Sequence, residues 1–307
     1  MKRNIYLKTI PPAEAVARVK ASIDRETLIR EETIPSHEAS GRVLAHAVHA
    51  RYSAPTFHSA AMDGYAVNAR STFAAREGHP LTLKAGETCF AVNTGHPMPE
   101  GCDAVIMIEQ VVLDGDGVTI EAPAFPWQHV RRIGEDIVAT ELLFPRNHQL
   151  RPWDVGALLS GGIWDVPVWE RVTVRIIPTG DEVLDFATHP DPGKGQVVES
   201  NSQMLAALAR ELGCVVERAA PVPDNPEALH QALKDSLDAG RHLTIFCAGS
   251  SAGSKDFTRA TLEKEGEILT HGIAAMPGKP SLLANCRGRL VAGAPGYPVS
   301  ALVCFKE

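Results

Sequence analysis

The chain has 307 residues, with 30 Lys and Arg against 37 Asp and Glu, a net charge of −7 and 44% hydrophobic residues. These values are typical of a soluble globular protein of about two or three domains, long enough to bury a core without disulfides. The acidic balance argues against duplex nucleic acid as a partner, because phosphate contacts need clustered Lys and Arg. No run of about 18 apolar residues and no signal peptide pattern occur, so we expect no membrane span and a cytoplasmic location.

The cysteines and histidines do not follow the spacing of a known metal-binding motif. The six cysteines are scattered without a CxxC pair, and the 12 histidines include no HExxH sequence. We therefore expect buried, unpaired cysteines and no zinc centre built on these residues.

The first half of the chain predicts two intertwined domains. Residues 13–23 have the periodicity of an amphipathic helix, and residues 46–138 form short two-fold patterns separated by Gly and Pro, which predict strands. Residues 139–170 return to a mixed helical pattern. If this segment pairs with the N-terminal helix, residues 1–45 and 139–170 form a discontinuous helical linker domain, and residues 46–138 are a β-rich inserted domain.

Residues 171–307 alternate between apolar strands and helices of about a dozen residues. This alternation predicts right-handed βαβ units and an α/β domain whose sheet is mostly parallel, with helices on both faces. In such sheets ligands bind where the strands end. The informative residues are therefore those in the loops that follow strands.

Three of these loops carry carboxylates. Gly180, Asp181 and Glu182 follow the first strand of the domain, and Asp224 follows the second. The third loop is rich in small residues, which let backbone N–H groups converge on an anion, and it ends at Asp256. An equally good interpretation is a plain connection with Asp256 as a helix N-cap. The anion interpretation uses Gly249, Ser250, Ser251 and Gly253.

Two Pro-Gly loops follow strands at the same predicted edge. One contains Lys279, which would be a fixed positive charge for an oxyanion, and the other runs from Pro295 to Pro298. A lone Pro-Gly-Lys is more often a β-turn with an incidental lysine. Together with the acidic loops, however, these residues have the composition of a Mg²⁺-assisted phosphoester site, where carboxylates hold the metal and Lys and backbone donors hold phosphates.

In the β-rich part, Asp63-Gly64 is a hairpin-turn signal, and Thr94–Gly101 and Arg131–Asp136 have the composition of loops. Each of these patterns is fully explained by turn chemistry alone. These patterns indicate a function only when their order along the chain is considered together with the other motifs.

That order resembles the MoeA/gephyrin family, the molybdopterin molybdenumtransferases. The matching sequences are, in order, AMDGYAV, TGHPMPEGCDAVIM, VRRIGEDI, PTGDEV, PDNPEAL, PGKP and PGYPVSA, and the small-residue loop with its Asp lies between PDNPEAL and PGKP. The resemblance covers the chain from about residue 10 onward.

The resemblance implies an enzyme that inserts molybdate into adenylylated molybdopterin with Mg²⁺ and releases AMP. It implies an α/β domain like that of the molybdopterin adenylyltransferases (MogA-like), a homodimer with small-molecule substrates, and contact with a molybdopterin adenylyltransferase. By position, the catalytic residues are Asp136, Glu182, Asp224, Asp256 and Lys279, and Glu182, Asp224 and Asp256 are the metal ligands. The substrate-binding residues are Thr94, Gly180, Gly249, Ser250, Ser251, Gly253, Pro295 and Pro298.

The chain departs from the family pattern at three places. His58 stands where the family usually has an acidic residue, and Met276 stands where it commonly has a lysine before the Pro-Gly-Lys loop. We also expect the family's C-terminal β-barrel domain to be missing after a helix that begins at Pro298. The small-residue loop and Tyr297 resemble the branch fused to a periplasmic-type binding domain. Two alternatives therefore stay open: a non-catalytic molybdopterin-binding scaffold, and a molybdopterin adenylyltransferase, which the β-rich part disfavours. Molybdenum and tungsten oxyanions are not distinguished by these residues.

Overall fold

The computed structural model describes residues 8–247 and 257–306. The chain divides into two compact units, the first formed by residues 1–32 and 169–307 and the second by residues 33–168. We call them the α/β unit and the β-rich unit, and each is described by itself. None of the helices in the described ranges combines the length and the apolar character needed to cross a bilayer.

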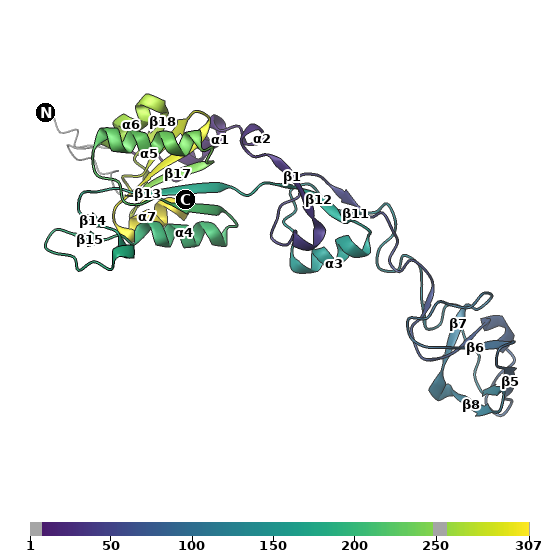
Figure 1. Cartoon of the computed structure of the whole chain (residues 1–307). Coiled ribbons are helices and arrows are strands. Elements are labelled where there is room, and N and C mark those ends of the chain that lie inside the picture. The colour runs from purple at the N-terminus through teal and green to yellow at the C-terminus, as the bar shows by residue number, and fades with distance from the viewer. Residues whose placement is uncertain (1–7, 248–256, 307) are drawn as a thin grey trace. The chain divides into compact units, whose positions relative to one another are not determined.

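The α/β unit is built on a six-stranded mixed sheet, which confirms the expected mostly parallel arrangement (Figure 1). Its neighbouring pairs β16–β13, β13–β17 and β17–β20 are parallel, and β20–β19 and β19–β18 are antiparallel. In spatial order the strands are β16 (Val215–Arg218), β13 (Thr173–Pro178), β17 (Leu243–Cys247), β20 (Arg289–Ala294), β19 (Leu282–Cys286) and β18 (Gly266–His271).

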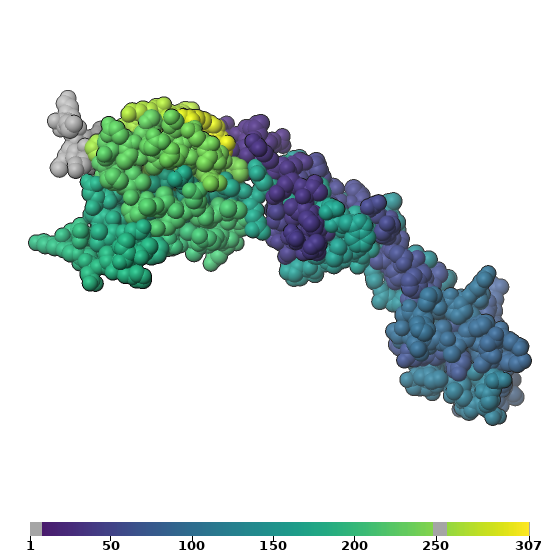
Figure 2. All heavy atoms as spheres, in the orientation of Figure 1, coloured from purple at the N-terminus to yellow at the C-terminus, as the bar shows by residue number. Residues whose placement is uncertain are grey.

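Helices cover both faces of this sheet, as predicted. On one face α5 (Pro226–Asp238) and α6 (Phe257–Glu265) pack on a core that includes Ile177 and Phe246. On the other face α4 (Asn201–Glu211) and α7 (Pro298–Lys306) pack on a core that includes Ile176. Adjacent residues such as Ile176 and Ile177 serve opposite faces because strand side chains alternate. The inner strands are therefore mostly apolar, and the space-filling view of this unit shows the spheres of the helices and loops around them (Figure 2).

The N-terminal helix α1 (Pro12–Ser22) is part of the α/β unit, where it packs against β18 and β19. Arg18 donates from Nη1 to the carbonyl of Leu269 at 2.8 Å, and Ala15 joins a small core with Ile273. This differs from the expected pairing with residues 139–170. The apolar side of a helix can pack on any complementary surface, and here the antiparallel edge of the sheet provides it. A short helix, α2 (Arg25–Leu28), follows.

One core of the β-rich unit is built from both flanks of that unit. Strand β2 (Val48–His49) pairs with β11 (Leu142–Phe144), and β1 (Glu31–Pro35) pairs with β12 (Asp165–Trp169). The short helix η1 (Ser36–Glu38) packs against α3 (Pro152–Ser160). The core itself contains Ala39, Leu44, Val48, Leu150, Leu158, Val166 and Val168.

Between these flanks lie two three-stranded antiparallel sheets with a common core. One has β4 (Gly64–Val67) between β6 (Cys89–Val92) and β7 (Ala104–Met107). The other has β9 (Gly117–Ile120) between β5 (Leu81–Lys84) and β8 (Val111–Asp114). The remaining short elements are β3 (Ser59–Ala60), which pairs with β10 (Val130–Arg131), and the 3-10 helices η2 (Ala69–Thr72) and η3 (Ile108–Gln110).

The hairpin expected at Asp63-Gly64 is not formed. The strands on either side, β3 and β4, pair with different partners. Gly64 instead begins the central strand β4, where a β-carbon would lie 1.9 Å from the carbonyl oxygen of Ile106. The glycine is therefore required by a close approach of two strands rather than by a turn.

Candidate functional site

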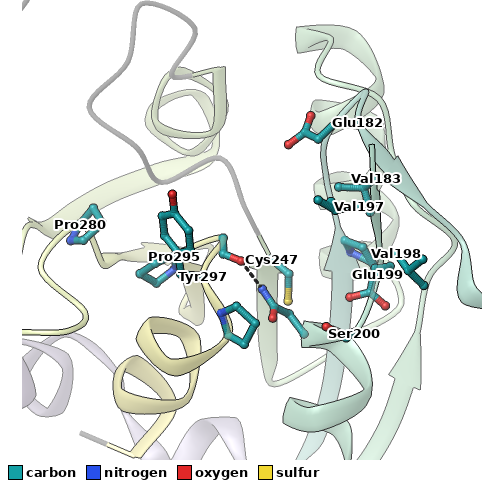
Figure 3. Close-up of a pocket in the computed structure, with 14 residues that line it drawn as sticks. Glu182, Val183, Val197, Val198, Glu199, Ser200, Cys247, Pro280, Pro295 and Tyr297 are labelled. Carbon is teal, nitrogen blue, oxygen red and sulfur yellow. Dashed lines mark hydrogen bonds between the residues drawn. The ribbon is translucent and has the colours of Figure 1, made fainter. Parts of the chain in front are cut away.

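A cavity of about 580 Å³ lies in the α/β unit at the edge where the parallel strands end (Figure 3). The figure shows Glu182, Val183, Val197, Val198 and Glu199 on one side, Pro280, Pro295 and Tyr297 on the other, and Cys247 between them. The remaining lining residues are Pro178, Ser200, Asn201, Gly296 and Pro298.

The register of the sheet brings these loops together. Pro178 at the end of β13 is paired with Cys247 at the end of β17, and Cys247 is paired with Ala294 at the end of β20. Three neighbouring parallel strands therefore end at the same level, and the segments that follow them open into one space. The sequence prediction that ligand-binding loops gather at this edge agrees with the position of the cavity.

Glu182 is held by a compact turn after β13. Val183 donates its N–H to the carbonyl of Gly180 at 3.2 Å, and Val197 donates to the carbonyl of Glu182 at 3.0 Å, where β14 (Val183–Leu184) pairs with β15 (Val197–Val198). The side chain of Glu182 is exposed and directed into the cavity (Figure 3).

The second acidic loop lies beside the first. The N–H of Asp224 donates to the Oδ1 atom of Asp181 at 3.1 Å, and the N–H of Gly180 donates to the carbonyl of Val222 at 3.1 Å. The loops that carry Glu182 and Asp224 are thus joined by direct hydrogen bonds, as expected for loops that follow adjacent parallel strands.

The Pro-Gly loops reach the same region. Pro295 and Pro298 line the cavity, and so does Pro280, the residue after Lys279. The carbonyl of Lys279 accepts a hydrogen bond from the N–H of Ile273 at 2.9 Å, while its side chain is exposed. The Lys279 backbone is therefore fixed and its ammonium group is accessible to solvent.

A buried polar cluster that sequence reasoning missed lies behind the cavity. Glu199, only 5% exposed, accepts hydrogen bonds from the N–H and the hydroxyl of Ser202 at 2.7 and 2.6 Å. Arg218 donates to Ser202 Oγ at 2.9 Å and to Asp185 at 2.8 Å, and it lies 4.5 Å from the ring centre of Phe186, within the 3-10 helix η4 (Phe186–Thr188). The Arg218 guanidinium holds the pKa of Asp185 below its usual value.

Two further lining residues were also not predicted. Asn201, at the start of α4, donates from Nδ2 to the carbonyl of Gly296 at 2.8 Å, and burial raises the pKa of the Cys247 thiol far above its usual value. Glu199, Ser200 and Asn201 occupy the start of a predicted helix at the ligand-binding edge. That position is the one sequence signal that could have identified them.

In the β-rich unit, the predicted residue Thr94 is bound to the Asp-Gly motif. Its N–H and its hydroxyl both donate to Asp63 Oδ1, at 2.7 and 3.1 Å, and these hydrogen bonds lower the pKa of Asp63. Asp136 accepts a hydrogen bond from Arg131 at 2.5 Å. The predicted residue Thr94 is thus held by Asp63 of the AMDGYAV motif, and Asp136 is held by Arg131 of its own VRRIGEDI motif.

The segment that contains His58 lies between these two loops. The N–H of Met98 donates to the carbonyl of His58 at 2.9 Å, and the N–H of Ile133 donates to His58 Nδ1 at 3.1 Å. The imidazole also packs against Trp127, with ring centres 4.8 Å apart. Because Nδ1 accepts, the imidazole proton is on Nε2.

The structure thus brings together only part of the predicted site. The α/β unit holds Gly180, Glu182, Asp224, Lys279, Pro295 and Pro298, and the β-rich unit holds Thr94 and Asp136. Within residues 8–247 and 257–306, no group of three or more His, Cys, Asp or Glu could hold a metal ion. The predicted residues Gly249, Ser250, Ser251, Gly253 and Asp256 lie outside the described residues.

Comparison with known proteins covers both units. Residues 10–162 match the family model of the MoeA N-terminal region (domain I and II), and residues 175–307 match that of a probable molybdopterin binding domain. The molybdopterin molybdenumtransferase of Haemophilus influenzae is 34% identical, covering 90% of this chain and 70% of the relative. That of Synechococcus elongatus is 32% identical, covering 89% and 72%. The molybdopterin biosynthesis MoeA protein of Pyrococcus horikoshii has a similar structure, with a TM-score of 0.80 at 28% identity, covering 97% of this chain and 77% of that one.

Proposed function

Because this chain belongs to the MoeA family of molybdopterin molybdenumtransferases, we propose that it uses the sheet-edge cavity to insert molybdate into adenylylated molybdopterin and to release AMP. Its role in molybdenum cofactor biosynthesis follows from the family. The observation that carries the proposal is the position of Glu182, Pro295 and Pro298 around one cavity, with the Asp181–Asp224 hydrogen bond beside it.

The chemistry that this arrangement supports is cleavage of the phosphoanhydride (P–O–P) bond of the substrate. A water oxygen attacks the phosphorus of the adenylyl group, and the bond from that phosphorus to the bridging oxygen breaks, so that AMP leaves with the new oxygen and the other phosphate stays on the pterin. If a molybdate oxygen attacks instead, the first product is an adenylyl-molybdate anhydride, which water then cleaves to AMP and molybdate. The accessible Lys279 ammonium would hold phosphate oxygens. Rate acceleration would come from positioning and charge stabilisation.

Magnesium fits the residues at the cavity. Mg²⁺ prefers oxygen ligands and is commonly bound by one or two carboxylates together with substrate phosphates. Glu182 is directed into the cavity, and Asp224 lies on the neighbouring loop, so these two side chains would hold the ion, with Asp256 as the third predicted ligand. When bound, the ion would neutralise charge on the phosphates.

We further propose that the protein is a homodimer, so that Thr94 and Asp136 of one subunit complete the site of another, and that it receives its substrate from a molybdopterin adenylyltransferase. Support for this comes from the family relationship and from the ordered Thr94–Asp63 and Asp136–Arg131 pairs. Static light scattering would test it, because a monomer at micromolar concentration would contradict the shared site.

The test of the main proposal is direct. Purified protein is incubated with adenylylated molybdopterin, Mg²⁺ and molybdate, and AMP is measured over time. We expect AMP release that requires both the protein and Mg²⁺. Absence of AMP from protein with normal circular dichroism would leave the scaffold function, which His58 and Met276 favour, as the better account. Formation of adenylylated molybdopterin from ATP would instead support the adenylyltransferase.

A further inference from the structure

Asn201 occupies an unusual position at the inner wall of the cavity. It opens α4, lines the cavity and is 9% exposed. Its Nδ2 atom donates to the carbonyl oxygen of Gly296 at 2.8 Å, the bond drawn as a dashed line in Figure 3. A carbonyl oxygen can only accept, so this bond fixes which end of the amide is nitrogen.

The other end of the amide, Oδ1, is buried and accepts no hydrogen bond from any residue in the described parts of the chain. Leaving a buried acceptor unsatisfied is costly, and such groups in native proteins usually have a partner. Asn285, in the same unit, shows the usual situation. Its Nδ2 donates to the carbonyl of Ser22 at 2.7 Å, and its Oδ1 accepts from the N–H of Gly288 at 2.8 Å.

The donors in the described part of the wall, which include the hydroxyls of Ser200 and Tyr297 and the thiol of Cys247, make no hydrogen bond to Asn201 Oδ1. Many of the lining residues are prolines, which have no amide hydrogen: Pro178, Pro280, Pro295 and Pro298. Both carboxylate oxygens of Glu199 accept hydrogen bonds from Ser202 and Arg218, and a carboxylate has no hydrogen to donate to Asn201. A donor for Asn201 Oδ1 is therefore best supplied by a ligand. The prolines together with Val183, Val197 and Val198 form apolar surface, which suits a flat ring that carries one or more N–H groups.

We propose that Asn201 is a specificity-determining residue, whose Oδ1 accepts a hydrogen bond from a ring N–H or amino group of the substrate while its Nδ2 holds the Pro295–Pro298 loop through Gly296. The inference rests on the proposed function, because adenylylated molybdopterin carries two such rings, the pterin and the adenine. A site with a buried acceptor discriminates against an analogue that lacks the donor.

The experiment measures equilibrium binding rather than turnover. Calorimetry gives the Kd of AMP, of purine riboside 5′-monophosphate, which lacks the adenine amino group, and of molybdopterin. These Kd values are measured for the wild type, Asn201→Leu and Asn201→Ala. Asn285→Leu is the matched control, since it removes an internally satisfied asparagine from the same unit.

We expect the Asn201 variants to raise the Kd of one ligand about 10-fold, which corresponds to one hydrogen bond, and Asn285→Leu to leave it unchanged. If adenine is the donor, wild-type protein prefers AMP over the analogue by a similar factor, and the preference vanishes in Asn201→Ala. If pterin is the donor, only the molybdopterin Kd rises.

Thermal stability supplies a second readout. Asn285→Leu breaks two satisfied hydrogen bonds. Asn201→Leu breaks one hydrogen bond and removes one unsatisfied buried acceptor, so the Tm of Asn201→Leu should fall less than the Tm of Asn285→Leu. Unchanged Kd values for both ligands in both Asn201 variants would overturn the inference. The two failures are distinguishable: wild-type protein that binds in an Asn201-dependent way but releases no AMP contradicts only the proposed function.

Discussion

The carboxylate of Glu182 lies close to Gly180, so that a β-carbon at residue 180 would approach both carboxylate oxygens to 3.0 Å as well as Val183 Cγ2 to 2.8 Å. Gly180 also has a φ of +136°, a conformation that other residues rarely adopt. The position of the acidic side chain in the cavity therefore depends on the absence of a side chain two residues earlier.

Gly180→Ala is expected to lower AMP release by about 10- to 100-fold, because displacement of a positioned group by even about 1 Å is costly to catalysis. Gly195→Ala is the control. Gly195 also has a positive φ, +87°, but a β-carbon there would meet no atom within 4 Å. Backbone strain should lower Tm in both variants, and equal loss of activity in both would contradict a specific role for the Gly180–Glu182 contact.

Glu182→Gln keeps the size of the side chain and removes its charge. We expect AMP release to fall by about 100-fold or more, because one charge-stabilising group at a reacting centre is commonly worth this much. Since Glu182 is exposed, unfolding in urea should be nearly unchanged. Glu211→Gln, at the exposed far end of α4, should match the wild type in both assays.

Two of the departures from the family pattern, His58 and Met276, can be reversed together. Met276 is 91% exposed, so Met276→Lys adds a cation without disturbing packing. In His58→Asp the new carboxylate can still accept the N–H of Ile133. We expect the double variant to change AMP release by less than about 10-fold relative to an active wild type, the scale of one or two surface charges. If AMP release is near zero in the wild type and rises in the double variant, but does not rise when Met276→Gln takes the place of Met276→Lys, the natural protein is a scaffold.

The Asp185–Arg218 pair predicts an acid-sensitive component of stability. Hydrogen bonds from Arg218 and then from the N–H of Ala187 lower the pKa of Asp185 in the folded protein. The pair therefore stabilises the fold above the unfolded-state pKa of about 4, and this contribution is lost as the pH falls below it. Urea unfolding between about pH 3 and 6 should show a shallower acid decline for Asp185→Asn than for Asp191→Asn, an exposed control.

His242 predicts a second pH dependence at a higher pH. Burial lowers its pKa, and Nδ1 accepts the N–H of Thr173 at 2.9 Å, which requires an unprotonated ring. The unfolded chain binds a proton more readily, so stability should fall as the pH drops through about 6.5. His242→Gln should remove this slope while the Asp185 effect remains. A wild-type unfolding free energy that stays constant between about pH 5 and 7.5 would contradict the prediction.

The features that were predicted correctly depend on local sequence. The strands Thr173–Pro178 and Leu243–Cys247 are mostly apolar runs followed by loops of polar and small residues, and the loops after parallel strands must share an edge. The Glu199–Ser202–Arg218 cluster and the Asn201–Gly296 bond were not predictable in this way. The Ser202–Arg218 and Asn201–Gly296 bonds join residues that are 16 and 95 positions apart, so they depend on the register of the folded sheet.

Local signals also misled where tertiary contacts override them. Asp63-Gly64 has turn composition, yet the glycine serves the approach of β4 to Ile106. The helix Pro12–Ser22 was correctly placed along the chain, but an amphipathic pattern does not specify the surface on which the helix packs.

The buried thiol of Cys247 bears on the metal that the enzyme transfers. Thiolates, not thiols, bind metals, and the raised pKa keeps this sulfur protonated at neutral pH. The pKa values of the other five cysteines are raised as well, chiefly by burial. The raised pKa values of the six thiols therefore make the sulfur atoms of this chain poor metal ligands at neutral pH.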